Sequence, residues 1–361
     1  MEWCLKQPKI ELHAHLNGSA RDSTLLELAR GLGERGVVDF ATIESVIRKN
    51  DRSLVECFKL FDLIRVLTTD HAAVTRITRE VIEDFASENV VYLELRTTPK
   101  KNEAIGMSKR SYIQAVLDGL RSVDAVDVDF IPSDVNKANS KKTLSINDNG
   151  VTKTKIFVRL LLSIDRQETG EAAMETVKLA LEMKDLGVVG VDLSGNPAAG
   201  EWDTFLPALN FAKEHELPIV LHCGELPDRL EEVQEMLNFY PQRIGHAIFL
   251  DDEQWRLLKL SKIPVEICLT SNVHTGCVTT IDDHHFIDLY NSKHPLLLCT
   301  DDPGVFSTSL SREHYLASSA FGLGREEMFE MGKTAIDYIF ADERVKKELR
   351  EIFSSFAAKE F

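Results

Sequence analysis

The sequence predicts an α/β fold, a closed parallel (β/α)8 barrel, from three observations. Short apolar runs rich in β-branched residues alternate with longer amphipathic stretches, a pattern typical of parallel sheets with crossover helices. Eight such runs occur along the chain. The length of 361 residues also suits this barrel, which spans roughly 200 to more than 400 residues. A doubly wound open sheet has the same alternation and is the second candidate.

The eight predicted strands show either period-two alternation or a continuous apolar pattern. In order, they cover residues 9–15, 90–96, 156–164, 188–193, 218–222, 243–246, 264–269 and 295–300. Pro218 and Pro264 open two of these runs, a strand position that tolerates the missing N–H of proline.

Amphipathic stretches between the strands predict the outer helices. They cover residues 53–67, 71–88, 108–123, 171–186, 202–215, 229–239, 253–260 and 283–291. Gly187 follows one of them at the usual C-terminal stop position.

Three further features complete the predicted organisation. Extra helices within residues 24–67 lie between the first two strands and are expected to cap the barrel mouth, and 309–321, 325–340 and 343–359 are expected to close the chain. The polar segment 133–154 predicts a loop or small hairpin. Because no internal repeat or linker is apparent, residues 1–361 are expected to form a single domain.

Composition excludes several classes of partner. The chain has 42 basic and 58 acidic residues, a formal net charge of -16, which disfavours nucleic acid polymers and basic membrane docking. No run approaches the ~18 apolar residues of a membrane span, and the N-terminus has no signal-peptide pattern. The six cysteines lack CxxC spacing and are expected to be reduced thiols of a cytosolic protein.

Histidines and a carboxylate at the ends of predicted strands indicate a metal site. His13 and His15 share one face of the first strand, roughly 6.6 Å apart at the backbone. His222 ends the fifth strand and Asp301 follows the eighth, so all four residues lie at the C-terminal mouth of the predicted barrel. Three imidazoles and one carboxylate suit one zinc ion with an open position for water.

Two related kinds of site do not match the sequence. A binuclear metal barrel would be expected to carry a bridging lysine at the end of the fourth strand, where this chain reads VDLSG at 191–195. The HxE and PCxxC motifs of cytidine-type deaminases are also missing. A single metal ion is therefore expected.

The segments HAHLNG, LSGN, HCGE, GHA and TDDPG, in this order over nearly the whole barrel, resemble the adenosine and AMP deaminase family of metal-dependent hydrolases. The resemblance implies that His13, His15, His222 and Asp301 bind zinc, with His15 also close to the substrate. It implies that Glu225 protonates N1 of the purine, that His246 orients and polarises the hydroxide, and that Asp302 holds this nucleophile and contacts N7. The amide of Gly195 would face N3.

The required chemistry explains these residue types. Zinc lowers the pKa of bound water from 15.7 toward about 7, so that hydroxide is available to attack C6. The ring must accept a proton as it takes up charge, and burial can raise the pKa of a carboxyl enough for it to act as the acid.

One departure from the family pattern bears on the substrate. Adenosine deaminases typically have an aspartate where this chain has Asn17, and a carboxylate there would repel a 5′-phosphate by about 1 to 4 kcal/mol at ~4 Å. The second strand ends in RTTPKK at 96–101, which provides hydroxyl and cationic donors for a phosphate. Thr97 and Thr98 are expected to contribute to substrate binding. Lys100 and Lys101 could instead be a solvated loop, and Arg96 a structural ion-pair partner.

Together these features resemble the adenosine deaminase-like subgroup that acts on nucleoside monophosphates, the N6-methyl-AMP deaminases. The resemblance implies hydrolysis of N6-methyl-AMP to IMP and methylamine by a cytosolic monomer with one zinc ion and a small purine nucleotide as its partner. Two alternatives remain: adenosine deamination to inosine, and a non-catalytic nucleotide-binding barrel. Substrate turnover distinguishes all three.

Overall fold

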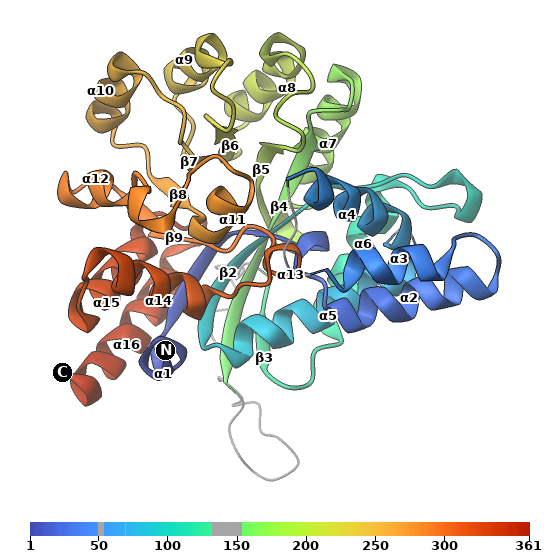
Figure 1. Cartoon of the computed structure of the whole chain (residues 1–361), viewed down its shortest axis with the longest axis horizontal. Helices are drawn as coiled ribbons and strands as arrows, with labels where there is room; N and C mark the ends of the chain where they lie inside the picture. Colours follow the sequence, from blue (N-terminus) through green and yellow to red (C-terminus); the bar gives the residue numbers. More distant parts are fainter. Residues whose placement is uncertain (50–53, 69, 132–153) are drawn as a thin grey trace.

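Eight parallel strands surrounded by helices form the centre of the protein in the computed structural model, which describes residues 1–49, 54–68, 70–131 and 154–361 (Figure 1). Neighbouring strands pair in the order β1-β2-β4-β5-β6-β7-β8-β9. Their bounds are β1 Lys9–His15, β2 Val90–Thr97, β4 Lys155–Asp165, β5 Val188–Ser194, β6 Ile219–Cys223, β7 Arg243–His246, β8 Val265–Ile267 and β9 Leu296–Leu298.

The ring closes where the chain leaves β9. Ala14 and Asp301 form a parallel bridge, in which Asp301 N donates to the His13 carbonyl at 2.7 Å and His15 N donates to the Asp301 carbonyl at 2.9 Å. The predicted barrel is therefore confirmed, and the open-sheet alternative is wrong. The closing bridge also places the end of the last strand beside the two histidines of β1.

Two of the predicted strands are too long. The runs at 264–269 and 295–300 form only Val265–Ile267 and Leu296–Leu298, because α11 (Leu269–His274) begins directly after β8 and the chain turns after β9. A short strand, β3 (Asp127–Asp129), pairs with β4 outside the ring and was not predicted. Its polar sequence DVD carries no apolar periodicity.

The helices around the barrel match most of the predicted stretches. They are α5 His71–Ser87, α6 Lys109–Arg121, α7 Gly170–Glu182, α8 Trp202–Glu214, α9 Leu230–Phe239, α10 Asp252–Ser261 and α12 Phe286–Asn291. Side-chain caps set several starts: Asp70, Ser108 and Asp251 each accept a bond from the backbone N–H three residues later. Helix α12 begins later than predicted, since 281–283 form a 3-10 turn.

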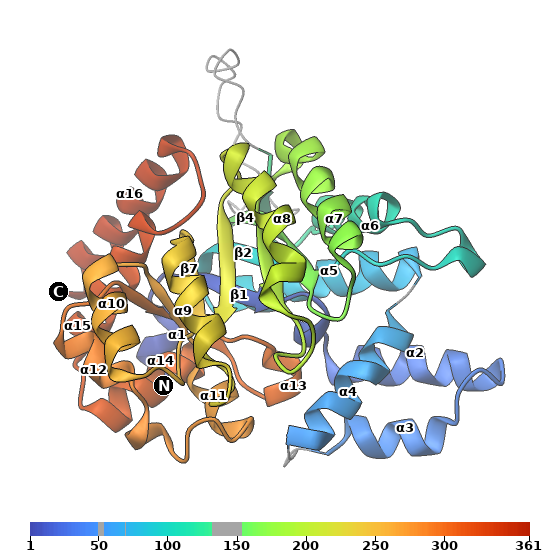
Figure 2. The ribbon, with the colours of Figure 1, turned by 90° about the horizontal axis from the view of Figure 1, so that it is seen from above.

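The extra helices form two groups outside this ring. Helices α2 (Asp22–Glu34), α3 (Phe40–Ile47) and α4 (Leu54–Leu67) form a lobe beside the barrel (Figure 2). Helices α14 (Leu310–Phe321), α15 (Arg325–Thr334) and α16 (Glu343–Glu360) close the chain, and the predicted helix 325–340 ends early in a 3-10 turn at 335–337. The predicted loop at 133–154 lies almost wholly outside the described residues. Every helix in the described segments is too short or too polar to cross a bilayer.

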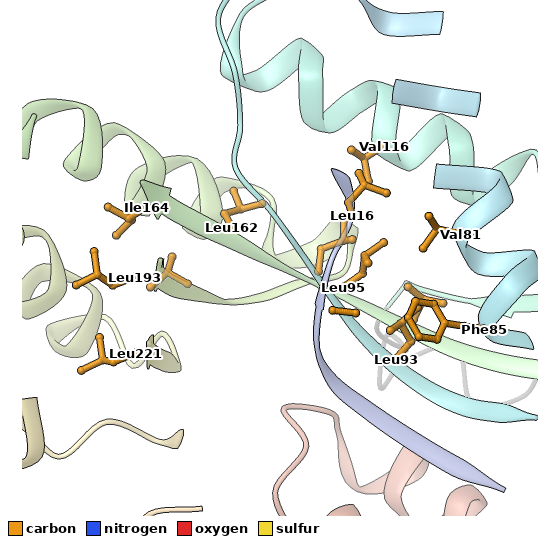
Figure 3. Close-up of a cluster of buried hydrophobic side chains, with 14 of the residues drawn as sticks. Leu16, Val81, Phe85, Leu93, Leu95, Val116, Leu162, Ile164, Leu193 and Leu221 are labelled. Carbon is orange, nitrogen blue, oxygen red and sulfur yellow. The ribbon is translucent and has the colours of Figure 1, made fainter. Parts of the chain in front are cut away.

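The core separates apolar and charged side chains on opposite faces of the strands. Leu93 and Leu95 of β2 point outward and pack with Val81 and Phe85 of α5 (Figure 3). The alternate residues of β2, Glu94 and Arg96, point inward and are fully buried with other charged groups. This alternation places an apolar layer under the helices and a polar interior below the barrel mouth.

Candidate active site and metal centre

The four predicted metal ligands converge at the C-terminal mouth of the barrel. His15 Nε2 lies 3.2 Å from His222 Nε2 and 3.3 Å from Asp301 Oδ1, and His13 Nε2 lies 3.4 Å from the same Asp301 oxygen. β1 positions the two histidines, β6 positions His222, and the closing bridge positions Asp301. Residues from three distant parts of the chain thus meet at one point.

The hydrogen bonds of the histidines leave their Nε2 atoms available to bind a metal ion. His13 Nε2 is buried and has no hydrogen-bond partner among the residues that the structure describes, whereas its Nδ1 is 2.7 Å from Glu266 Oε2. The Nδ1 of His222 likewise faces a carboxylate, 3.0 Å from Asp192 Oδ1, while its Nε2 points toward His15 Nε2 at 3.2 Å. A carboxylate at Nδ1 holds the ring proton there and leaves Nε2 free to bind a metal, which is the usual outer arrangement of metal-binding histidines.

The spacing of the donor atoms agrees with this interpretation. Ligand atoms about 2.0–2.1 Å from a tetrahedral zinc ion lie about 3.3–3.4 Å from one another. The three separations here are 3.2, 3.3 and 3.4 Å. A ligand atom of His246 also lies within 4.8 Å of those of His13, His222 and Asp301, but the group at its Nδ1 is the neutral amide of Asn272, at 3.0 Å, and not a carboxylate. The four donors are therefore close enough to share one metal ion, and His246 lies beside them.

Arg96 connects the two carboxylates behind the histidines. Its guanidinium is fully buried and lies 3.1 Å from Asp192 Oδ1 and 2.8 Å from Glu266 Oε2. Glu266 also pairs with the buried Arg243, at 2.6 Å. Burial alone would raise the pKa of Glu266, but Arg96 and Arg243 hold it well below its ordinary value. We call Arg96, Asp192, Arg243 and Glu266 the buried ion network.

Three members of this network, Asp192, Arg243 and Glu266, were not predicted from the sequence, and two roles remained open for the fourth, Arg96. Asp192 and Glu266 stand at inward positions of apolar strands, and Arg243 begins β7, so a charged residue within each apolar run was the available signal. For Arg96, the structural ion-pair alternative is confirmed and a phosphate contact is wrong, since its guanidinium faces Asp192 and Glu266.

Glu225 and His246 face one another beside the four predicted metal ligands. Glu225 follows β6, and its Oε1 lies 3.9 Å from His246 Nε2 at the end of β7. The Glu225 side chain is 22% exposed, and burial raises its pKa above the ordinary value. Burial also holds the pKa of His246 well below its ordinary value. These shifts favour the protonated carboxyl of Glu225 and the neutral imidazole of His246.

Asp302 lies next to Asp301 and is buried at the mouth. Burial and the neighbouring Asp301 carboxylate raise the pKa of Asp302 well above its ordinary value. Gly18 makes room for this side chain, because a Cβ at Gly18 would lie 1.6 Å from Asp302 Oδ1. Ser271 of α11 supports the other carboxylate by donating to Asp301 Oδ2 at 2.6 Å.

Gly195 follows β5 in a conformation that favours glycine. Its φ is 102°, and a Cβ there would lie 2.6 Å from Asp165 Oδ1. The backbone is also left-handed at His246 (φ 61°) and Asp301 (φ 63°), which is uncommon for non-glycine residues and concentrates at functional sites.

Asn17 lies in a group of polar side chains on one side of the mouth. Its Nδ2 donates to Thr68 Oγ1 at 2.7 Å, and its Oδ1 accepts from Tyr112 OH at 2.9 Å and lies 3.5 Å from Thr97 Oγ1. Lys100 Nζ lies 3.3 Å from Thr68 Oγ1. We call these five residues the mouth cluster. Thr98 is half-buried directly after β2, next to Thr97 of the cluster.

The two lysines after β2 differ sharply. Lys101 is about half exposed and pairs with Glu175 at 2.7 Å, so the solvated-loop interpretation is correct for it. Burial, and then the charge of Arg65, lower the pKa of Lys100 to about 8. Lys100 is half-buried and contacts Thr68 of the mouth cluster, so the solvated-loop interpretation is wrong for this residue.

Comparison with known proteins gives consistent matches over the whole barrel. The sequence profile described as adenosine deaminase matches residues 8–355. An N6-mAMP deaminase from Arabidopsis thaliana is 65% identical over 355 residues, which cover 98% of each chain. An N6-methyl-AMP deaminase from Homo sapiens is 37% identical over 95% of this chain and 92% of its own. The crystal structure of Arabidopsis ADAL complexed with IMP is 63% identical, has a TM-score of 0.92 and covers 100% of both chains.

Proposed function

The chain belongs to the adenosine deaminase family, and on this premise we propose that it hydrolyses N6-methyl-AMP to IMP and methylamine. The mouth cluster is the observation that carries the choice of a monophosphate. It combines the neutral Asn17, hydroxyl groups and the half-buried ammonium of Lys100 on one side of the predicted metal ligands. The high identity to a plant N6-mAMP deaminase supports the same substrate.

His13, His15, His222 and Asp301 would hold one Zn²⁺. When bound, this ion would lower the pKa of water toward about 7 and so supply hydroxide near neutral pH. Asp192 and Glu266 would support it by holding the Nδ1 protons of His222 and His13.

Glu225 would move both protons of the reaction. As oxygen adds to C6, Glu225 gives a proton to N1, which keeps it in IMP. The resulting carboxylate takes the remaining hydroxyl proton and passes it to the N6 nitrogen, so that the C6–N6 bond breaks and neutral methylamine leaves. The raised pKa of Glu225 favours the protonated form that the first step needs.

The other site residues would orient the reactants. His246 and Asp302 would hold the attacking oxygen, and Asp302 would also contact N7. The Gly195 amide would face N3 at the opposite edge of the purine. These groups come from the ends of β5, β7 and β9. A planar base can therefore be held between them with C6 toward the four metal ligands.

The mouth cluster would bind the 5′-phosphate. Lys100 supplies positive charge, and the hydroxyls of Thr68, Thr97 and Thr98 with the Asn17 amide can donate hydrogen bonds. An aspartate in place of Asn17 would repel the phosphate by about 1 to 4 kcal/mol at ~4 Å. We further propose that residues 1–361 act as one domain, as a monomer in the cytosol, in keeping with cysteines that lack CxxC spacing.

A substrate comparison tests this proposal. Purified, metal-replete protein is incubated separately with N6-methyl-AMP, AMP and adenosine, and products are followed by absorbance and chromatography, with Glu225→Ala as the inactive control. We expect IMP and methylamine from N6-methyl-AMP, with a higher kcat/KM than for adenosine. Faster turnover of adenosine than of both monophosphates would overturn the phosphate assignment, and no turnover of any substrate would overturn the enzyme assignment.

A further inference from the structure

A chain of buried hydrogen bonds approaches His246 from the side away from Glu225. The backbone N of Phe286 lies 3.1 Å from His284 Nδ1, and His284 Nε2 lies 3.1 Å from Asn272 Oδ1. Asn272 Nδ2 in turn lies 3.0 Å from His246 Nδ1. All four side chains are buried, so these contacts have little competition from water.

The direction of this chain is fixed at its outer end. The Phe286 backbone N–H can only donate, so His284 Nδ1 must accept and carries no proton. Burial lowers the pKa of His284 to about 2, so its imidazole is neutral and has its single proton on Nε2. That N–H needs an acceptor, which requires Asn272 to turn its oxygen toward His284.

The orientation of Asn272 then determines the state of His246. With its oxygen facing His284, the amide of Asn272 turns its NH2 group toward His246 Nδ1. Nδ1 must accept this bond, so the single proton of the neutral His246 ring lies on Nε2. This is the nitrogen that faces the reaction site, 3.9 Å from Glu225 Oε1.

We propose that Asn272 and His284 are positioning residues, which hold His246 in the tautomer that points an Nε2–H donor at the attacking oxygen and Glu225. This inference rests on the proposed hydrolysis for its consequence, but the tautomer itself does not depend on the substrate. An Nε2–H group can donate to oxygen but cannot accept its proton. His246 in this tautomer is therefore not the proton acceptor, which agrees with the proposed role of Glu225 in moving the protons.

His285 strengthens this arrangement from the backbone side. Its Nε2 lies 2.9 Å from the His246 carbonyl oxygen, and its ring stacks on His284 with centroids 4.4 Å apart. The His246 backbone is left-handed, a conformation that persists only when its surroundings hold it. Adjacent residues thus hold the backbone of His246 directly and its ring through Asn272.

The direct test is nuclear magnetic resonance of metal-replete protein labelled with ¹⁵N histidine. Long-range proton–nitrogen correlations distinguish the two tautomers, and a His246→Gln variant identifies the His246 signals. We expect the Nε2–H pattern in the unmodified protein. An Nδ1–H pattern would overturn the proposal, whatever substrate the enzyme uses, so this result is independent of the turnover assay.

Asn272→Asp tests the positioning role with almost no change in shape. Its carboxylate can only accept, so it should draw the His246 proton to Nδ1 and reverse the tautomer. We expect kcat to fall about 10²- to 10⁴-fold, the range for loss of correct proton placement, with little change in KM. Asn291→Asp, at an exposed position, is the matched control and should behave as the unmodified protein. An unchanged tautomer or an unchanged kcat in Asn272→Asp would each contradict the proposal.

A second pair of variants tests His284. The amide nitrogen of His284→Gln can replace the Nε2–H donor, so this variant should keep the His246 tautomer and most of kcat. His284→Phe removes the donor and should give mixed tautomers and a lower kcat. Equal behaviour of the two variants would overturn the role of His284.

Discussion

The buried ion network and the mouth cluster lie on two sides of the same site and differ in almost every physical respect. The network consists of fully buried charges on strands, paired with one another at 2.6–3.1 Å. The mouth cluster consists mainly of neutral groups, with one ammonium, at strand ends, on a helix and in loops. The comparison indicates that the charged residues on the strands position the reacting groups. The mouth cluster instead recognises the part of the substrate that does not react.

The largest effect is expected from a substitution that changes proton transfer and leaves the mouth cluster intact. Glu225→Gln keeps the shape of the side chain but removes its titrating proton, so kcat should fall about 10²- to 10⁴-fold. Metal content should stay unchanged, because Glu225 is not among the four converging ligands. Steady-state kinetics and elemental analysis measure the two quantities. Near-normal kcat in this variant would mean that another group moves the protons.

A second substitution tests whether the network supports the metal site. Arg96→Met leaves two buried carboxylates without their shared cation, which should lower the free energy of unfolding by about 3–5 kcal/mol. Zinc affinity should fall about 10- to 100-fold, because Asp192 and Glu266 would orient His222 and His13 less firmly. Denaturant unfolding and zinc titration measure these effects. Arg110→Met removes an exposed arginine paired with Glu182 and should change neither, so equal effects would contradict the network's role.

Arg96 also shows what the sequence could and could not predict. Strand ends were predictable because apolar runs stop abruptly at His222 and His246, and the ligands were predictable because parallel strands present these ends at one mouth. The partner of an inward charge was not predictable, because Arg96 meets Asp192 and Glu266 across the barrel, 96 and 170 residues away. Likewise, nothing local in the sequence placed Asn272 against His246 or separated Lys100 from Lys101.

A third substitution tests selection at the mouth. Asn17→Asp introduces a carboxylate where the 5′-phosphate is proposed to bind, and repulsion of about 1 to 4 kcal/mol should raise KM for N6-methyl-AMP by about 5- to 1,000-fold. Adenosine lacks this phosphate and serves as the internal control, with a kcat/KM that should stay level or rise. If both substrates lose activity equally, Asn17 has a structural role only.

The smallest expected effect separates the two neighbouring lysines. Lys100→Met removes one charge-assisted hydrogen bond, worth about 1.5–3 kcal/mol, and should raise KM for N6-methyl-AMP by about 10- to 150-fold. Lys101→Met should leave KM unchanged, since its exposed pair with Glu175 contributes little. The pKa of Lys100 is about 8, and lysine is charged below its pKa, so kcat/KM for the monophosphate should decline as the pH rises through about 8. If kcat/KM of Lys100→Met declines in the same way, the pH dependence belongs to another group. If the decline is absent from this variant, the ammonium of Lys100 binds the phosphate.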